Sequence, residues 1–196
     1  MGEGFVGYPG GERVEGFSNP TWTLLLTLGE WIHLSSWIMA KFWGALFGLM
    51  GLVLAMKWFQ ALRPNGTDAY PALPAFLLAF SPQYVMWAAS GLENALLSML
   101  IAAASLRMLH EIRHGGLPGS GVIWALVAIS RPEAPLYAFV GGMVGGLTLL
   151  CTQGWRRVLY WAPRWLAFCA SLFIAWHGWR WVYFAWEFPN TYYAKL

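Results

Sequence analysis

Four short polar stretches carry most of the residues that could do chemistry in this chain. They are Gly11–Trp22 (GERVEGFSNPTW), Ser90–Leu96 (SGLENAL), Ser130–Glu133 (SRPE) and Phe188–Lys195 (FPNTYYAK). A carboxylate in such a stretch can orient or deprotonate a hydroxyl group, and an arginine or lysine can hold a phosphate. If the fold brings them together, the four stretches predict one site for an anionic ligand.

Arg131 and Glu133 give the strongest of these signals. The chain is apolar from Gly121 to Ser130, and a helix over residues 119–131 rises about 20 Å against a hydrocarbon core of about 30 Å. Both charges are then expected below the membrane surface, where an ionisable side chain usually marks a functional site. We interpret Arg131 as a phosphate-binding arginine whose guanidinium Glu133 holds. The alternative is a structural ion pair of Arg131 with Glu133 or Glu93.

The first stretch offers a cation, an acid and an amide ahead of an apolar helix. Arg13 could hold a phosphate, Glu15 is a candidate catalytic base, and Asn19 is a candidate substrate-binding group. The competing interpretation is a solvated loop, capped by Ser18 or Asn19, before a helix that begins at Pro20. The local pattern alone favours the solvated loop.

Glu93 stands at the start of an apolar run and is a second candidate base, as Glu133 is a third. Ser90 is a good N-cap residue, and an acid in the first turn of a helix is stabilised by the helix dipole. Capping therefore explains an exposed Glu93. A Glu93 that faces a cavity, with Gly91 before it, suits the close approach of a ligand instead. Both interpretations stay open.

The last stretch follows an aromatic-rich segment. Its candidate substrate-binding residues are Asn190, Tyr192, Tyr193 and Lys195. The rings could stack on a sugar or a lipid headgroup, with the ammonium group beside a phosphate. The alternative is an aromatic belt with a snorkelling lysine. Arg164 and Arg180, which come earlier, either assist with an anionic lipid or snorkel.

The elements that must position these residues are transmembrane helices. Of the 196 residues, 58% are apolar and 11% are charged, whereas a soluble domain carries about 25% charged residues. The 14 tryptophans suit rings at membrane–water boundaries. We therefore predict an integral membrane protein. The net charge of +3 is spread along the chain, which gives no case for nucleic-acid binding.

The histidines and cysteines do not predict a metal or redox site. His110 and His114 are four residues apart, but they lie beside two arginines and are interpreted as surface residues. Cys151 and Cys169 lie in apolar runs and are interpreted as inert thiols. The ligand spacing supports no divalent metal, and no cofactor is implied.

Apolar runs predict an all-α fold, a polytopic transmembrane helix bundle with about six crossings and one interfacial helix. Pro20–His33 is too short to span and is the interfacial helix. The crossings are Trp37–Phe59, Pro71–Ala89, Leu92–Leu109, Gly121–Ser130, Ala134–Leu150 and Val158–Trp176. Pro82 should kink or break the second crossing. The glycines that give the first crossing a face for close helix contact are Gly44, Gly48 and Gly51.

Basic residues set the predicted orientation. The turns after Phe59, Leu109 and Cys151 carry arginine and lysine, so the positive-inside rule puts them in the cytoplasm. Residues 1–20 then form an extracytoplasmic loop, 21–186 the transmembrane bundle and 187–196 the start of another extracytoplasmic loop. Both chain ends and all four polar stretches lie on the extracytoplasmic side, where we expect the stretches to line a shared site.

The four stretches, in this order, resemble motifs of the bacterial polytopic glycosyltransferases of the GT-C type. The likeness is closest to the mycobacterial terminal arabinofuranosyltransferase and to proteins labelled flagellar motor control, and it runs from Gly2 to Lys195. It implies a GT-C-like fold in a bacterial plasma membrane. It also implies inverting transfer of a sugar from a polyprenyl-phosphate carrier to a cell-envelope glycan on the outer face.

The resemblance assigns places to the candidate residues. Glu15 and Asn19 fall in the first outer loop. The residues at the border of the lipid-phosphate pocket are Arg131, Glu133, Asn190, Tyr192 and Lys195. Relatives carry an acidic motif upstream of GERVEGF, where the catalytic base is expected, and further spans and an outer domain after NTYYAK. We therefore expect the chain to be the N-terminal portion of such an enzyme, with the catalytic acid upstream of Met1.

Two other functions compete with the enzyme. The first is a non-catalytic membrane subunit derived from the same fold, which packs within a larger membrane complex. The enzyme predicts a lipid-linked sugar donor, a glycan acceptor and the remainder of the enzyme as partners, whereas the subunit predicts membrane lipid and other membrane subunits. The second is a transporter, because breaks at Pro82 and Pro132 resemble the interrupted helices that line transport sites.

Overall fold

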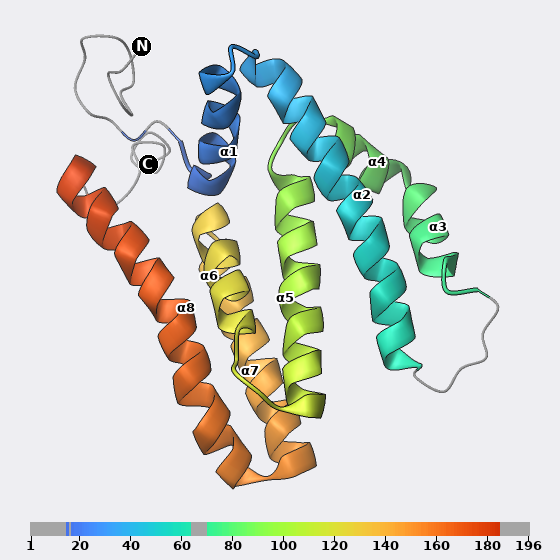
Figure 1. Ribbon diagram of the computed structural model, residues 1–196, viewed down its shortest axis with the longest axis vertical. Helices are drawn as coiled ribbons and strands as arrows, with labels where there is room; N and C mark the ends of the chain where they lie inside the picture. Colours follow the sequence, from blue (N-terminus) through green and yellow to red (C-terminus); the bar gives the residue numbers. More distant parts are fainter. Residues whose placement is uncertain (1–14, 16, 64–69, 185–196) are drawn as a thin grey trace.

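The computed structural model describes residues 15, 17–63 and 70–184 (Figure 1). In this part of the chain the structure is helical throughout, without a strand. The helices are α1 (Pro20–Trp31), α2 (Ser36–Leu62), α3 (Leu73–Ala79), α4 (Pro82–Ala89), α5 (Asn94–His114), α6 (Ser120–Ser130), α7 (Ala134–Gln153) and α8 (Trp155–Phe184). The prediction of an all-α fold is confirmed for these residues.

Among the described helices, four are long and apolar enough to cross a membrane: α2, α5, α7 and α8. They coincide with four of the six predicted crossings, and each extends a few residues past the predicted bounds at one end or both. Figure 1 shows them running lengthwise through the molecule. Their length and composition indicate an integral membrane protein. The orientation across the membrane and the likeness to the GT-C fold stay predictions.

The other two predicted crossings are short helices. Pro71–Ala89 divides into α3, with 7 residues, and α4, with 8 residues. The predicted break at Pro82 is confirmed, because α3 ends at Ala79 and Pro82 starts α4, where a proline without a backbone N–H is tolerated. Helix α6 has 11 residues and rises about 16 Å. Four of the six predicted crossings are therefore helices of membrane length, the other two segments are shorter, and the count of six stays a prediction.

The predicted glycine face of α2 is where α4 packs. A side chain at Gly44 would overlap the carbonyl group of Ala88, and one at Gly51 would overlap the phenol of Tyr84. Tyr84 Oη donates a hydrogen bond to the carbonyl of Gly48 at 2.7 Å. Small residues thus let the two backbones approach closely, as is common between membrane helices.

Helix α6 lies at the centre of the bundle, in contact with α1, α5, α7 and α8. Ala125 and Val127 are fully buried, and the ring of Trp124 fills the space that Gly141 leaves on α7. The buried carboxylate of Glu111 accepts hydrogen bonds from the backbone N–H of Ser120 at 2.8 Å and from its hydroxyl at 2.6 Å. Glu111 thus satisfies the backbone N–H of Ser120 at the first residue of α6, and the helix dipole stabilises its negative charge, so Glu111 fixes the start of α6.

Two local predictions were wrong. Trp22 was expected at the membrane boundary, but it is 4% exposed and packs against Phe47, with ring centroids 6.4 Å apart. Ser90 was expected to cap the helix that carries Glu93, but α5 begins at Asn94. Ser90 instead closes the end of α4, where its hydroxyl donates to the carbonyl of Trp87 at 2.8 Å. Gly91, at φ +83°, then turns the chain toward α5 in a conformation that favours glycine.

Candidate functional site

Three of the four polar stretches meet at one end of the bundle. They lie at the start of α1, in the connection between α4 and α5, and in the connection between α6 and α7 (Figure 1). Thr21 Oγ1 donates to Ser130 Oγ at 2.9 Å, and Ser130 Oγ donates to the carbonyl of Leu126 at 2.6 Å. These two bonds hold the start of α1 against the end of α6.

The first loop reaches the second stretch through a side-chain hydrogen bond. Asn19 stands at the N-cap position of α1, but its side chain makes no capping bond. Its Nδ2 donates instead to Glu93 Oε2 at 2.9 Å. The alternative of a solvated loop capped by Ser18 or Asn19 is therefore wrong at Asn19. The amide joins residues that are 74 positions apart in sequence.

Arg131 connects the second and third stretches. Its Nε lies 2.7 Å from Glu133 Oε1, its Nη1 lies 3.7 Å from Glu93 Oε1, and Nη1 donates to Asn94 Oδ1 at 2.8 Å. The guanidinium thus makes both of the ion pairs foreseen as alternatives to phosphate binding. The side chain of Arg131 is 31% exposed and that of Glu133 is 46% exposed, so both can still meet a ligand.

The geometry of Arg131 follows from the proline after it. Residue 131 ends α6 in an extended conformation, φ −154° and ψ 155°. A proline disfavours the helical conformation in the residue before it, so Pro132 ends the helix at this position. Glu133 then stands at the N-cap position of α7. The sequence Arg-Pro-Glu therefore places a cation and an acid on the same turn, close enough to pair.

We call Asn19, Glu93, Asn94, Arg131 and Glu133 the Arg131 cluster. It holds two carboxylates and one guanidinium, so at neutral pH its formal charge is negative by one. A phosphate would be repelled by the carboxylate in excess unless further cations approach. The predicted donors of such charge, Arg13 and Lys195, lie outside the described residues.

Glu15 is buried against another partner. Its Oε2 lies 2.5 Å from Arg180 Nε, and each residue is 5% exposed. Burial raises the pKa of Glu15 above its ordinary value, and the hydrogen bond and charge of Arg180 oppose this shift in part. The pair ties the first loop to the end of α8. Arg180 is buried in this pair and therefore does not snorkel, whereas its assistance with an anionic lipid stays a prediction.

Other predicted residues lie apart from the cluster or outside the described part of the chain. Arg164 donates to the carbonyl of Tyr160 at 2.7 Å, with its guanidinium 3.8 Å from the centre of that ring. Asn190, Tyr192 and Tyr193 lie outside the described residues. No three His, Cys, Asp or Glu residues within residues 15, 17–63 and 70–184 are grouped so as to hold a metal ion.

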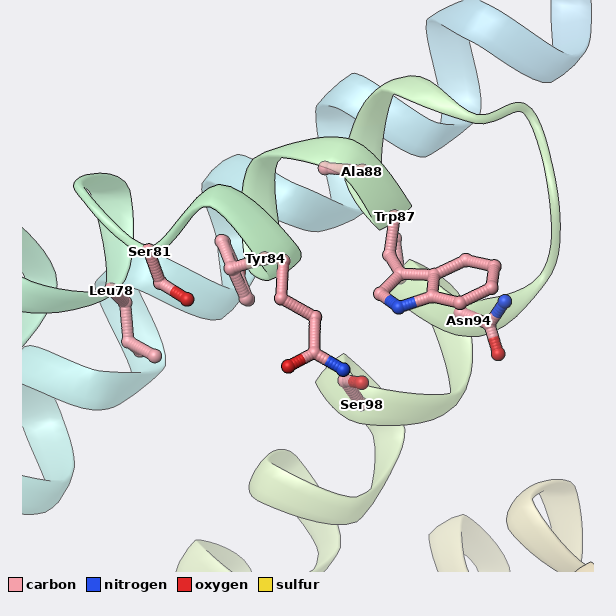
Figure 2. A pocket seen from close by; sticks show the side chains of 9 residues that line it. Leu78, Ser81, Tyr84, Trp87, Ala88, Asn94 and Ser98 are labelled. Carbon is pink, nitrogen blue, oxygen red and sulfur yellow. The ribbon is translucent and has the colours of Figure 1, made fainter.

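Asn94 is a member of the cluster for which the sequence predicts no role. Besides accepting from Arg131, its side chain lines a cavity of about 390 Å³ between α4 and α5. Figure 2 shows Ser81, Tyr84, Trp87, Asn94 and Ser98 around this space. The sequence does show a polar residue directly after Glu93, at the start of an apolar helix. Its role follows only from the hydrogen bond to Arg131, which lies 37 positions further along the chain.

Comparison with known proteins adds no relative. No protein-family model, curated protein or solved structure matches the chain. The case for a function therefore depends on the residues of the Arg131 cluster and on the resemblance of the four motifs.

Proposed function

We propose that this chain is a membrane glycosyltransferase, or the N-terminal portion of one, that uses a sugar carried on a polyprenyl phosphate. One observation carries the proposal furthest. Carboxylates from two separate connections, Glu93 and Glu133, share the guanidinium of Arg131 at the end of the short central helix α6. Ionisable groups at membrane depth are costly, and they usually mark a functional site.

The chemistry suits these groups. In an inverting transfer, a carboxylate takes the proton of the acceptor hydroxyl while the oxygen of that hydroxyl attacks the anomeric carbon of the sugar. The bond from that carbon to the phosphate oxygen breaks, and the electron pair stays on the phosphate. Glu133 is the most exposed of the described candidate bases, because Glu15 is buried and the side chain of Glu93 is 13% exposed. Arg131 would stabilise the negative charge that grows on the leaving phosphate.

Binding of the lipid phosphate tests the proposal directly. The full chain is placed in lipid nanodiscs, and retention of added polyprenyl phosphate is measured by native mass spectrometry. Replacing Arg131 by alanine should weaken binding at least tenfold. The matched control is Arg113→Ala, because Arg113 lies at the end of α5 away from the Arg131 cluster and donates to the carbonyl of Ala61. Equal binding by the Arg131→Ala variant and the wild type would overturn the proposal.

One observation favours the second function, a non-catalytic membrane subunit. Within the described residues, each charged member of the Arg131 cluster is paired by its neighbours, as expected of an ion network that only joins helices. This function predicts that the chain co-purifies in a fixed ratio with other membrane proteins and carries no polyprenyl phosphate. The nanodisc measurement distinguishes the two functions.

A further inference from the structure

Two arginines and a tyrosine form a charged surface on the first three turns of α8. Tyr160 contacts two guanidinium groups of its own helix. The centre of its ring lies 5.5 Å from the guanidinium carbon of Arg157 and 3.8 Å from that of Arg164. Because residues three and four apart are neighbours on a helix, the three side chains share one face of α8. We call Arg157, Tyr160 and Arg164 the Tyr160 cluster.

The surrounding chain fixes where these cations lie. Figure 1 shows the start of α8 at the same end of the bundle as the end of α5, away from α1. Gly115, at φ +80°, ends α5, and a side chain there would overlap Arg157 Nη2. Arg164 donates to the carbonyl of Tyr160 at 2.7 Å, so its guanidinium turns back toward the start of α8. Both charges therefore lie at the end of the bundle opposite to the Arg131 cluster.

The Tyr160 cluster has no counter-ion among the described residues. The ion pairs in this part of the chain join other side chains, and none includes Arg157 or Arg164. Glu111 lies at this end of the bundle, but it is 2% exposed and already accepts from Ser120. Helix α8 has no acid in its first turn, and its dipole adds positive charge at the same end. An anion from outside the described protein would therefore be stabilised here.

The depth of the cluster matches the headgroup layer of a membrane. Helix α8 is long and apolar enough to cross, and Arg164 lies nine residues after Trp155, a rise of about 14 Å. Arg164 is exposed, and Tyr160 is 42% exposed. Arginines near the end of a membrane helix direct their charge to the interface, where lipid phosphates lie. Both guanidinium groups are thus accessible at the level of those phosphates.

We propose that the Tyr160 cluster binds the phosphate of an anionic phospholipid, whose acyl chains remain in the surrounding membrane. A guanidinium presents paired N–H groups that match two oxygens of a phosphate, and the ring of Tyr160 holds both cations by cation–π contact. The net negative charge of the lipid compensates cations that the described protein leaves without a carboxylate. This site is independent of the proposed function, because it lies at the other end of the bundle.

Removal of single arginines tests the site. The full chain is kept in detergent micelles, and binding of added phosphatidylglycerol is measured by native mass spectrometry. Arg157→Ala and Arg164→Ala should each weaken binding about fivefold, as expected for one cation near a lipid phosphate. The matched control is Arg156→Ala, because Arg156 is exposed on the same turn but points about 100° away from Arg157. An equal loss in this control would show general charge attraction and overturn the site.

Two further probes distinguish an anionic lipid from other phosphates. Phosphatidylcholine carries a phosphate but no net charge, and it should bind the wild type about fivefold more weakly than phosphatidylglycerol does. Inorganic phosphate in excess should leave bound phosphatidylglycerol in place, because it is not held in the membrane. Equal binding of the two lipids, or displacement by inorganic phosphate, would contradict the assignment to an anionic lipid.

A labelling experiment covers the case in which the variants do not fold. Wild-type protein is irradiated with a phosphatidylglycerol that carries a diazirine on its headgroup, and the labelled residues are located by mass spectrometry. Labels should fall on residues 155–164 and 115–119. The end of α2 is the internal control, because it carries Lys57 and is followed by Arg63. Labels of equal intensity on residues 57–63 would show that headgroups gather at any cation, which excludes a specific site at Tyr160.

Discussion

The two ends of α6 each hold a carboxylate with an arginine, yet they are built differently. At its start, Glu111 is 2% exposed and accepts hydrogen bonds from the backbone N–H and the hydroxyl of Ser120. Arg107 Nε lies 3.0 Å from its Oε1. At its end, Arg131 and Glu133 are partly exposed, and their partners come from other connections. We call Glu111, Arg107 and Ser120 the Glu111 cluster. The buried carboxylate of Glu111 has a structural role as the cap of a helix. The Arg131 cluster is partly exposed and has one carboxylate in excess, so it can still contact a ligand.

The largest effect on stability should come from the Glu111 cluster. Glu111→Ala leaves the backbone N–H and the hydroxyl of Ser120 without their acceptor and should lower the free energy of unfolding by about 2–3 kcal/mol. Arg107→Ala removes the partner that is 46% exposed and should cost under about 1 kcal/mol. Unfolding in mixed micelles measures both values. Similar losses of unfolding free energy in the two variants would show that the Glu111–Ser120 bonds stabilise the fold no more than the ion pair with Arg107 does.

A smaller loss is expected from Asn19→Ala. The variant removes the hydrogen bond to Glu93 that joins the first loop to α5, and a bond of this kind to a charged, half-buried group contributes about 1–2 kcal/mol. The same unfolding assay applies, with Thr27→Ala as the control, because Thr27 bonds only to its own helix in the described structure. If Asn19→Ala is as stable as the control, the loop is not held by this bond.

Glu133→Gln should barely change stability. The pair with Arg131 is partly exposed, and pairs of this kind contribute about 0.5 kcal/mol or less. Under the proposed function the variant should nevertheless lose sugar transfer, because glutamine cannot accept the proton of the hydroxyl. Transfer is measured in membranes with a polyprenyl-phosphate-linked sugar as the donor. Unchanged transfer would exclude Glu133 as the base, and a large stability loss would make the Arg131 cluster structural.

The smallest effect concerns pH and Glu15. Because burial raises its folded pKa, the folded state binds this proton more tightly than the unfolded state does. Its contribution to stability is present at low pH and is lost as the pH rises from the ordinary value of 4.5 through the raised pKa. The wild type should therefore lose stability relative to Glu15→Gln across this window. A difference that grows in the opposite direction would show that Arg180 outweighs burial.

Local patterns predicted the elements of the fold better than its tertiary contacts. The glycine spacing on α2, the break at Pro82 and the short apolar run before Arg131 each depend on a few adjacent residues, and each has its counterpart in the structure. Trp22 was misplaced because a tryptophan suits both a membrane boundary and the apolar core of a helix bundle. Only the arrangement of α1 on α2 and α6 decides between them.

The candidate site was foreseen as a gathering of polar stretches, but its pairings were not. Whether Arg131 meets Glu93 or Asn94 depends on the rotation of α5 about its axis, which no local motif specifies. The role of Glu111 was not predicted either, because its partner Ser120 lies nine positions further along the chain, beyond the turn between α5 and α6. The roles predicted for Glu15, Glu93 and Glu133 as bases stay predictions.

The shortness of α6 has a consequence for how the guanidinium is aimed. Glu111 anchors one end, so the number of residues in between sets both the depth of Arg131 and the direction in which it points. Adding one residue would shift it by about 1.5 Å and swing it by about 100° around the helix axis. An insertion within α6 is therefore expected to misplace Arg131 even when every residue of the Arg131 cluster is kept.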